Sequence, residues 1–115
     1  MKQMNNNRKQ QLRDIMIQAW RICKVTGETF AECLKRSWMI VRLKKAMKSG
    51  IVQFFFMKQN GELRQAFGTT DPTRYEYTPT GDRPRAPYAD CVQYWDTVKQ
   101  GFRMFKTYNL KSIAL

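Results

Sequence analysis

Histidine is absent from this chain, and cysteine occurs three times, which is an odd number. Cys23, Cys33 and Cys91 do not follow the close spacing of ligands in structural zinc sites. We therefore expect no metal ion and no disulfide. We interpret the three thiols as small apolar groups of the core.

Long apolar runs are also absent, since none approaches the roughly 18 residues that a membrane-spanning helix needs. The polar, asparagine-rich residues 1–7 contain no apolar segment of the kind found in signal peptides. These absences predict a cytoplasmic protein with no membrane partner. The length of 115 residues predicts one structural unit.

Carboxylates are few: nine Asp and Glu stand against 21 Lys and Arg, which gives a net charge of +12. The excess is concentrated in residues 1–50, which hold twelve cations and three carboxylates. Such a balance favours an anionic partner, most often nucleic acid. The alternative is a protein that is merely basic.

The sequence offers no catalytic arrangement. Without histidine, proton transfer would fall to Asp, Glu, Lys or Tyr, and the carboxylates are scattered along the chain. Neither of the glycine-rich phosphate-binding patterns, G-x-x-x-x-G-K-[ST] and G-x-G-x-x-G, occurs. We expect a binding protein without cofactor, not an enzyme.

Two β-hairpins are predicted in the second half of the chain. Residues 51–58 are dense in β-branched and aromatic side chains, and residues 62–68 form the return strand. Between them, Asn60 and Gly61 favour a tight type I′ turn, which requires positive φ at both positions. Residues 91–106 repeat the alternating pattern and predict the second hairpin.

Two helices are predicted to precede these hairpins. Apolar residues recur at spacings of three and four over residues 9–24, and Gly27 is a plausible end of that helix. Thr29 and Glu32 form a capping box that begins a second helix over residues 30–48. The second helix is apolar nearly all round, so we expect it to pack on the first helix and on the sheet.

On this second helix, Trp38 lies on the main apolar stripe, so we expect it in the core. Lys35, Arg42 and Lys45 share the narrow remaining stripe and form a basic helix patch. A DNA-reading helix-turn-helix is the alternative. It is less favoured than an αα-hairpin, because a recognition helix needs a polar exposed face.

The expected organisation is α+β: an N-terminal αα-hairpin packed on a small antiparallel β-barrel. Residues 1–8 are predicted to be disordered, residues 9–49 to form the helical hairpin, and residues 50–115 to form the barrel. Within the barrel, residues 70–89 contain four prolines and are predicted as a long loop.

Residues 101–106, Gly-Phe-Arg-Met-Phe-Lys, followed by Asn109 and Leu110, resemble the closing signature of WYL domains. Residues 51–58 with Arg64 resemble the opening hairpin of the same SH3-like barrel. The layout over residues 28–113 is most similar to short WYL-like SH3 β-barrel proteins of gut bacteria and their phages. The chain departs from WYL transcriptional regulators, because the naming tripeptide is not intact and the preceding winged helix is missing.

This resemblance implies a small non-catalytic barrel with a nucleic-acid-binding or nucleotide-binding, regulatory role. It also implies that Arg103 matches an arginine that WYL domains use for ligand contact. We predict that Arg64, Arg103 and Lys106 bind the phosphates of single-stranded nucleic acid or an oligonucleotide. Tyr94 or Trp95 is predicted to stack on its bases.

Two alternatives to this prediction stay open. Arg103 can instead pair with Asp96 or Glu62 across the hairpin and stabilise the sheet. The chain can also be a protein-docking module, such as a phage protein that binds or inhibits a host defence protein, or a component of a virion or homo-oligomer. In the phage case, the expected location is the host bacterial cytoplasm.

Overall fold

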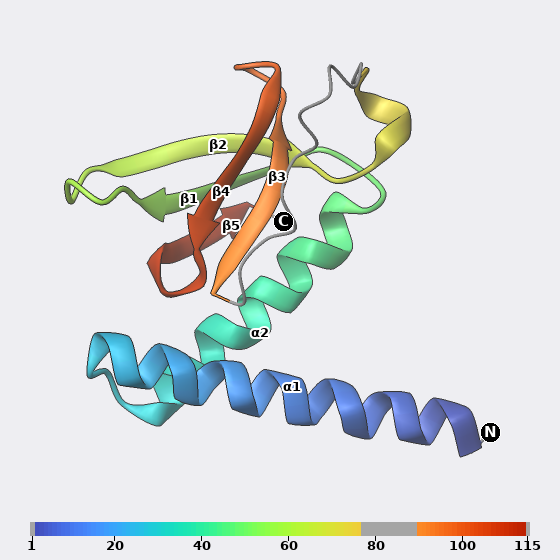
Figure 1. Cartoon of the computed structure of the whole chain (residues 1–115), viewed down its shortest axis with the longest axis vertical. Coiled ribbons are helices and arrows are strands. Elements are labelled where there is room, and N and C mark those ends of the chain that lie inside the picture. Colours follow the sequence, from blue (N-terminus) through green and yellow to red (C-terminus); the bar gives the residue numbers. More distant parts are fainter. Residues whose placement is uncertain (1, 77–89, 115) are drawn as a thin grey trace, which may run out of the picture.

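The computed structural model describes residues 2–76 and 90–114, with side chains from Asn7 onward. Two helices precede a five-stranded antiparallel sheet, which confirms the predicted α+β class (Figure 1). The regular elements are α1 Lys2–Thr26, α2 Phe30–Met47, β1 Val52–Met57, β2 Leu63–Thr69, β3 Cys91–Asp96, β4 Gly101–Lys106 and β5 Leu110–Ala114, with 3₁₀ turns η1 Pro72–Arg74 and η2 Thr107–Asn109.

The helix α1 begins earlier than predicted. Residues 2–8, predicted to be disordered, form the first turns of α1. The helix ends at the predicted place. Gly27 adopts φ 71°, and its N–H donates to the carbonyl of Cys23 at 2.9 Å.

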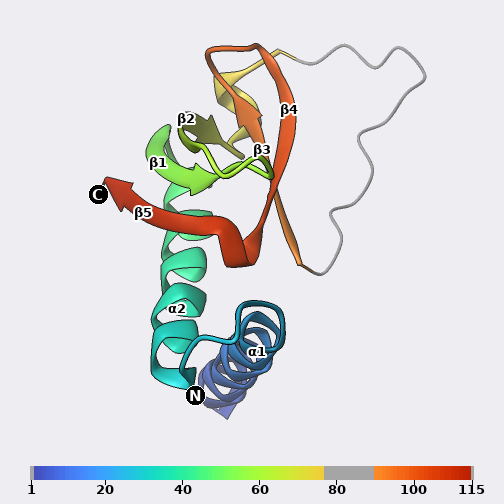
Figure 2. The ribbon, with the colours of Figure 1, turned by 90° about the vertical axis from the view of Figure 1, so that its left-hand side faces the viewer.

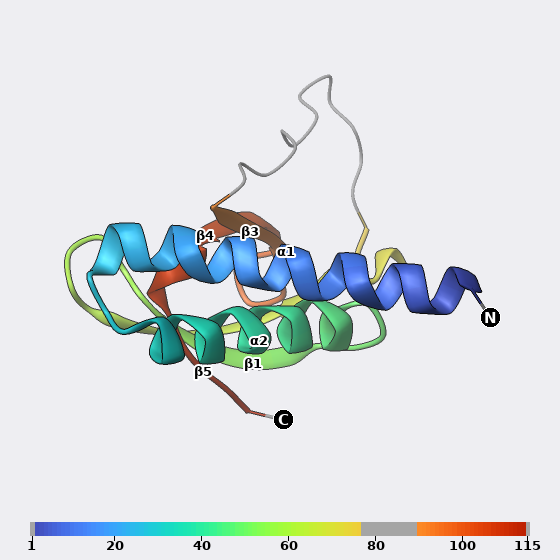
Figure 3. The same ribbon diagram turned by 90° about the horizontal axis from the view of Figure 1, so that it is seen from below.

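The predicted N-cap of α2 is confirmed, since the Thr29 hydroxyl accepts a hydrogen bond from the Glu32 N–H at 3.3 Å. The helix α2 packs on α1 and also contacts β1 and β5, as predicted (Figures 2 and 3). Seen from below, α1 and α2 lie side by side in front of the sheet. The buried residues of α2 are Cys33, Ser37, Ile40, Leu43 and Met47.

The predicted core position of Trp38 is wrong, because 42% of its surface is exposed. The buried stripe of α2 instead includes Cys33, Ser37 and Ile40, one position before the stripe that carries Trp38. A helix that is apolar nearly all round does not specify which stripe will face its neighbours. The contacts of α2 with α1 and with the sheet determine which stripe is buried.

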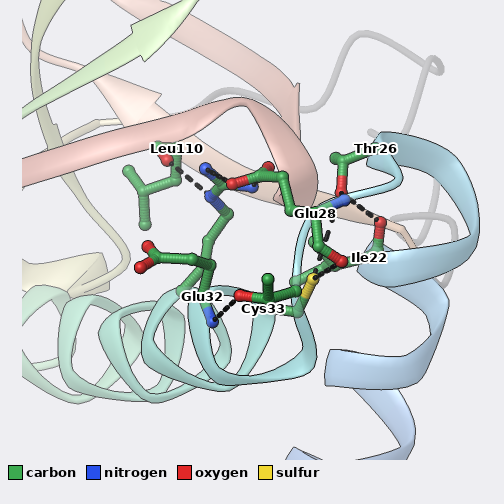
Figure 4. Close-up of polar contacts among 8 residues, drawn as sticks. Ile22, Thr26, Glu28, Glu32, Cys33 and Leu110 are labelled. Carbon is green, nitrogen blue, oxygen red and sulfur yellow. Dashed lines mark hydrogen bonds and ion pairs between the residues drawn. The ribbon is translucent and has the colours of Figure 1, made fainter.

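A partly buried arginine connects the helical hairpin to the sheet. Arg36 on α2 donates from Nε to the Leu110 carbonyl at 3.1 Å and from Nη1 to Glu28 Oε1 at 2.6 Å (Figure 4). The Arg36 guanidinium holds the pKa of Glu28 below its usual range. The ion pair holds Arg36 against the α1–α2 connection, and the hydrogen bond joins Arg36 to the start of β5. Arg36 therefore links the helical hairpin to the sheet.

The strand order is β4-β3-β2-β1-β5. Both predicted hairpins are confirmed, with β1 paired to β2 and β3 paired to β4. The two hairpins meet along a short seam, where β2 and β3 pair only at Gly68↔Asp96 and Thr69↔Trp95. On its other side, β1 pairs antiparallel with β5.

The turn between β1 and β2 is not the predicted type I′ turn. The Lys58 N–H donates to the Glu62 carbonyl at 2.8 Å, which leaves a three-residue loop, and φ is positive at Gly61 but not at Asn60. The Asn60 side chain accepts a hydrogen bond from the Glu62 N–H at 3.0 Å. This Asx interaction favours the longer loop, in which glycine alone takes the left-handed position.

An aromatic cluster fills the inner face of the sheet. Phe54 meets Tyr94 edge-to-face at a ring-centroid distance of 5.0 Å, and Phe56 stacks on Phe105 at 5.0 Å. On the opposite face of β1, alternate residues such as Phe55 are only half-buried, so the outer face is less completely covered than the inner one.

None of the described helices is long and apolar enough to cross a membrane. The three cysteines are unpaired, and no cluster of side chains in residues 2–76 and 90–114 could hold a metal ion. A hydrogen bond with Cys33, together with burial, raises the pKa of Cys23 to about 11. This thiol is therefore protonated at neutral pH and is a poor nucleophile.

Candidate nucleic-acid interface

A groove of about 600 Å³ lies where the β1–β2 hairpin and the β3–β4 hairpin diverge. Its lining comes from the tip of the first hairpin, from β3 and β4, and from η2. Four cations line it, and no carboxylate does within the described chain. The four cations are Lys58, Arg64, Arg103 and Lys106.

Strand register explains why the two arginines face the same groove. Arg64 lies directly opposite Phe56 on the neighbouring strand, and Arg103 lies directly opposite Tyr94. Side chains that are directly opposite in an antiparallel pair share a face of the sheet. Each arginine therefore lies beside an aromatic residue of the inner face, at the edge where that face opens to solvent.

Tyr94, which lines the groove, has a buried hydroxyl without a hydrogen-bond partner in the described part of the chain. The residue as a whole is 1% exposed. Burial and the nearby Asp96 carboxylate raise the pKa of Tyr94 to about 12. The phenol is therefore a neutral hydrogen-bond donor at physiological pH, and it lies at the wall of a cationic groove.

Behind the groove, a buried carboxylate holds the two arginines. Asp96 is 2% exposed, and its Oδ1 accepts N–H hydrogen bonds from Val98 at 2.9 Å and Lys99 at 3.0 Å. Its Oδ2 lies 3.7 Å from Arg64 Nη2 and 3.6 Å from Arg103 Nε. Those separations exceed the roughly 2.7–2.9 Å of a charge-assisted hydrogen bond. Both guanidinium groups therefore keep donors for another acceptor.

The structure brings together four of the five predicted ligand residues: Arg64, Tyr94, Arg103 and Lys106 all line the groove. Trp95 is on the opposite face of β3, where it stacks on Tyr75 at 4.6 Å. The pairing of Arg103 with Asp96, the structural alternative in the sequence analysis, is also present.

The prediction that Tyr94 or Trp95 offers a stacking surface is wrong, because the two residues are only 1% and 5% exposed. On the inner face Tyr94 packs against Phe54 and Phe105. On the other face Trp95 packs against Tyr75 and Phe102. Alternation along a strand shows which residues share a face, but it does not show what will cover that face.

Sequence reasoning missed Lys58. It precedes the hairpin loop, and its Nζ lies 3.9 Å from Glu62 Oε2 across that loop. The available signal was its position at the end of the strand that carries Phe56, two residues earlier and therefore on the same face.

The basic helix patch does not contribute to the groove. Lys35, Arg42 and Lys45 are exposed on α2, and none of them lines the groove. Lys35 lies 4.0 Å from Glu32 of the same helix. The residues that the structure describes therefore carry separate basic surfaces on the sheet and on the helical hairpin.

A family model described as WYL_2, Sm-like SH3 beta-barrel fold, matches residues 40–111. The chain belongs to the WYL_2 family. The predicted SH3-like barrel and the resemblance to WYL domains are thereby confirmed. No curated protein and no solved structure shows a significant match to this WYL_2 chain.

The WYL_2 match contains every residue that lines the groove, from Phe56 to Asn109. The helix α1 and the first ten residues of α2 precede the matched range. The groove is thus part of the WYL_2 barrel, whereas most of the helical hairpin lies outside the matched region.

Proposed function

We propose that this WYL_2 protein is a non-enzymatic regulatory protein that binds single-stranded nucleic acid or an oligonucleotide in the groove between its two hairpins. The supporting observation is that four cations and no carboxylate of the described chain line that groove. The proposal includes a cytoplasmic location, where single-stranded RNA and nucleotides are available.

The main contribution to affinity in this proposal is phosphate binding. Arg64 and Arg103 share the single carboxylate of Asp96, so this group retains positive charge. A phosphate that enters the groove gains charge-assisted hydrogen bonds from guanidinium donors and releases counterions from the nucleic acid. Binding of this kind does not depend on base sequence, because every nucleotide carries the same phosphate.

Base stacking does not contribute to the proposed binding. Tyr94 and Trp95 are buried, so neither offers a ring face to a base. The Tyr94 hydroxyl is also buried, so the phosphate contacts in this proposal come from the four cations. Without stacking, which contributes about 1–3 kcal/mol per base in other proteins, we expect weak affinity.

Replacing Arg103 with alanine should weaken the binding of a labelled single strand about tenfold, the equivalent of about 1.4 kcal/mol. The physical reason is the loss of one charge-assisted contact to phosphate. Fluorescence anisotropy at low and at moderate salt measures the Kd. The slope of log Kd against log salt should also be shallower in Arg103→Ala, because fewer counterions are released.

Lys35→Ala is the matched control, since it removes one exposed positive charge at a site that does not line the groove. It should leave the Kd unchanged. The proposal fails if the wild-type protein binds no strand at low salt. It also fails if Lys35→Ala and Arg103→Ala weaken binding equally, because binding would then reflect net charge alone.

Tyr94→Phe should separate stability from binding. Because the Tyr94 hydroxyl is buried without a partner, removing it should raise the free energy of unfolding by about 1 kcal/mol. The same substitution should leave strand binding unchanged, because the buried hydroxyl does not reach a ligand in the groove. Urea unfolding and anisotropy on the same preparation test both effects. A less stable Tyr94→Phe protein would show that the hydroxyl has a structural partner instead.

The pH dependence provides a second readout of Tyr94. The pKa of about 12 in the folded protein lies above the ordinary value of about 10, so the unfolded state loses this proton first. The contribution of Tyr94 to folding stability should therefore be constant below about pH 10 and fall by about 1.4 kcal/mol per pH unit between pH 10 and 12. In Tyr94→Phe this part of the alkaline loss should be absent.

A further inference from the structure

The helical hairpin carries a row of large apolar side chains, of which Phe30 and Leu34 are half-buried and the others are exposed. Leu12, Met16 and Trp20 of α1 are 42–55% exposed. Their spacing of four residues places them on one stripe of the helix. The same spacing places Phe30, Leu34 and Trp38 on one stripe of α2.

The two stripes form a single surface, because the rings of Trp20 and Phe30 stack at a centroid distance of 4.4 Å. We call these six residues of α1 and α2 the outer hairpin face. All six precede residue 40, where the WYL_2 match begins.

Exposed apolar residues are common on protein surfaces when they occur singly. A contiguous set is different, since connected apolar patches mark interaction sites. The composition agrees with this reading. Tryptophan and methionine are enriched in protein–protein interfaces, and tryptophan is frequent among the residues that dominate binding energy. Trp20 and Trp38 are both on the outer hairpin face, and both are more than 40% exposed.

Cations surround the outer hairpin face. Residues three or four positions along a helix are neighbours on its surface. By this rule, six exposed cations adjoin the six apolar residues, and none of the carboxylates of α1 and α2 does. The six cations are Arg8, Lys9, Arg13, Lys24, Lys35 and Arg42.

This charge distribution selects the kind of partner. A second copy would bring two strongly positive surfaces together, since residues 1–50 hold twelve cations and three carboxylates. A single nucleic-acid strand could stack on Trp38, but it has no aliphatic side chains that would pack against Leu12, Met16 and Leu34. An amphipathic helix with acidic flanks satisfies both features, because its apolar side chains meet the row and its carboxylates meet the surrounding cations.

We propose that the outer hairpin face docks an acidic amphipathic helix of a partner protein. The helices α1 and α2 provide two adjacent apolar stripes, and a third helix packs across such a pair as in a helical bundle. The site is separate from the groove of the sheet, so this inference does not depend on nucleic-acid binding.

The test uses the full chain and two labelled synthetic helices of about 18 residues, long enough to span five turns. The first has leucine at helical spacing and glutamate elsewhere, and the second has lysine in place of every glutamate. In fluorescence anisotropy, the glutamate helix should bind at least tenfold more tightly than the lysine helix. Trp38→Ser should weaken the binding of the glutamate helix at least tenfold.

Val25→Ser is the matched control. Val25 is also an exposed apolar residue of α1, at 57%, but it is not three or four positions from any of the six residues. It should leave peptide binding unchanged, as should Arg103→Ala in the groove. Thermal unfolding checks that Trp38→Ser folds, and Arg42→Glu is a second variant that should weaken binding through charge alone.

Several results would overturn the proposal. One is equal binding of the two helices, or no binding of the glutamate helix at a concentration of about 1 mM. Another is unchanged binding in Trp38→Ser and Arg42→Glu. A Trp38-dependent dimer in sedimentation would identify a second copy as the occupant. Trp38-dependent binding of an oligonucleotide or of phosphatidylglycerol vesicles, without binding of the glutamate helix, would identify an anionic polymer or a membrane surface.

Discussion

Replacing Phe54 with alanine is expected to lower the free energy of unfolding by about 3–5 kcal/mol. Phe54 is fully buried and contacts the rings of Phe56, Tyr94 and Phe105, so it touches both hairpins. Its removal leaves a cavity that the surrounding rigid rings cannot fill by small movements. Urea unfolding, followed by circular dichroism, gives the free energy directly.

Phe55→Ala is the matched control, because it makes the same chemical change one position along β1. Phe55 points to the other face of the sheet and is half-buried, so the loss should be clearly smaller than at Phe54. Equal losses at the two positions would show that the aromatic cluster on the inner face is not the main core of the sheet.

The second large effect is expected at Gly68, where alanine should cost about 3 kcal/mol. A Cβ at this position would lie 2.5 Å from Tyr94 Cδ2 and 3.0 Å from Phe54 Cε1. Both rings are fully buried and pack against each other, so neither can move away without disturbing the core. The residue also pairs with Asp96 in the seam between the hairpins.

Gly101→Ala makes the same change where there is space. No atom lies within 4 Å of a Cβ at Gly101, and its φ is not positive. Stability should be unchanged or should rise by about 0.4–1 kcal/mol through the unfolded state. If alanine were tolerated equally at Gly68 and Gly101, the close approach of the Tyr94 ring to the backbone would be wrong.

Local signals in the sequence were sufficient for most of the fold. The alternation in β1 to β4, the glycine at position 27 and the cap at Thr29 act through neighbouring residues, and each element that they predicted is present. The errors arose where tertiary packing decides. Trp38 was placed in the core because a helix that is apolar nearly all round does not reveal which side its neighbours will cover.

The candidate site was predictable in its charges but not in its aromatic residues. The cations of these strands are readable from sequence, and Arg64, Arg103 and Lys106 all line one groove. The register that sets Arg64 opposite Phe56 was not readable, because the predicted two-residue turn is a three-residue loop. The burial of Tyr94 and Trp95 was not readable, since it depends on aromatic residues distant in sequence that pack on the two faces of β3. A hydroxyl left without a partner is likewise a property of the assembled core.

The short seam between the hairpins has a consequence for local opening motions. Two residue pairs and the hydrogen bond from the Thr97 N–H to the Phe67 carbonyl, at 3.0 Å, connect the backbones of β2 and β3. Because so few backbone contacts cross the seam, we expect the seam to open locally more often than the hairpins themselves. A ligand that contacts Lys58 and Arg64 on one hairpin and Arg103 and Lys106 on the other would hold the two hairpins together. Occupancy of the groove would then slow amide hydrogen exchange along the seam. Even a weak ligand would in this way make the sheet more rigid.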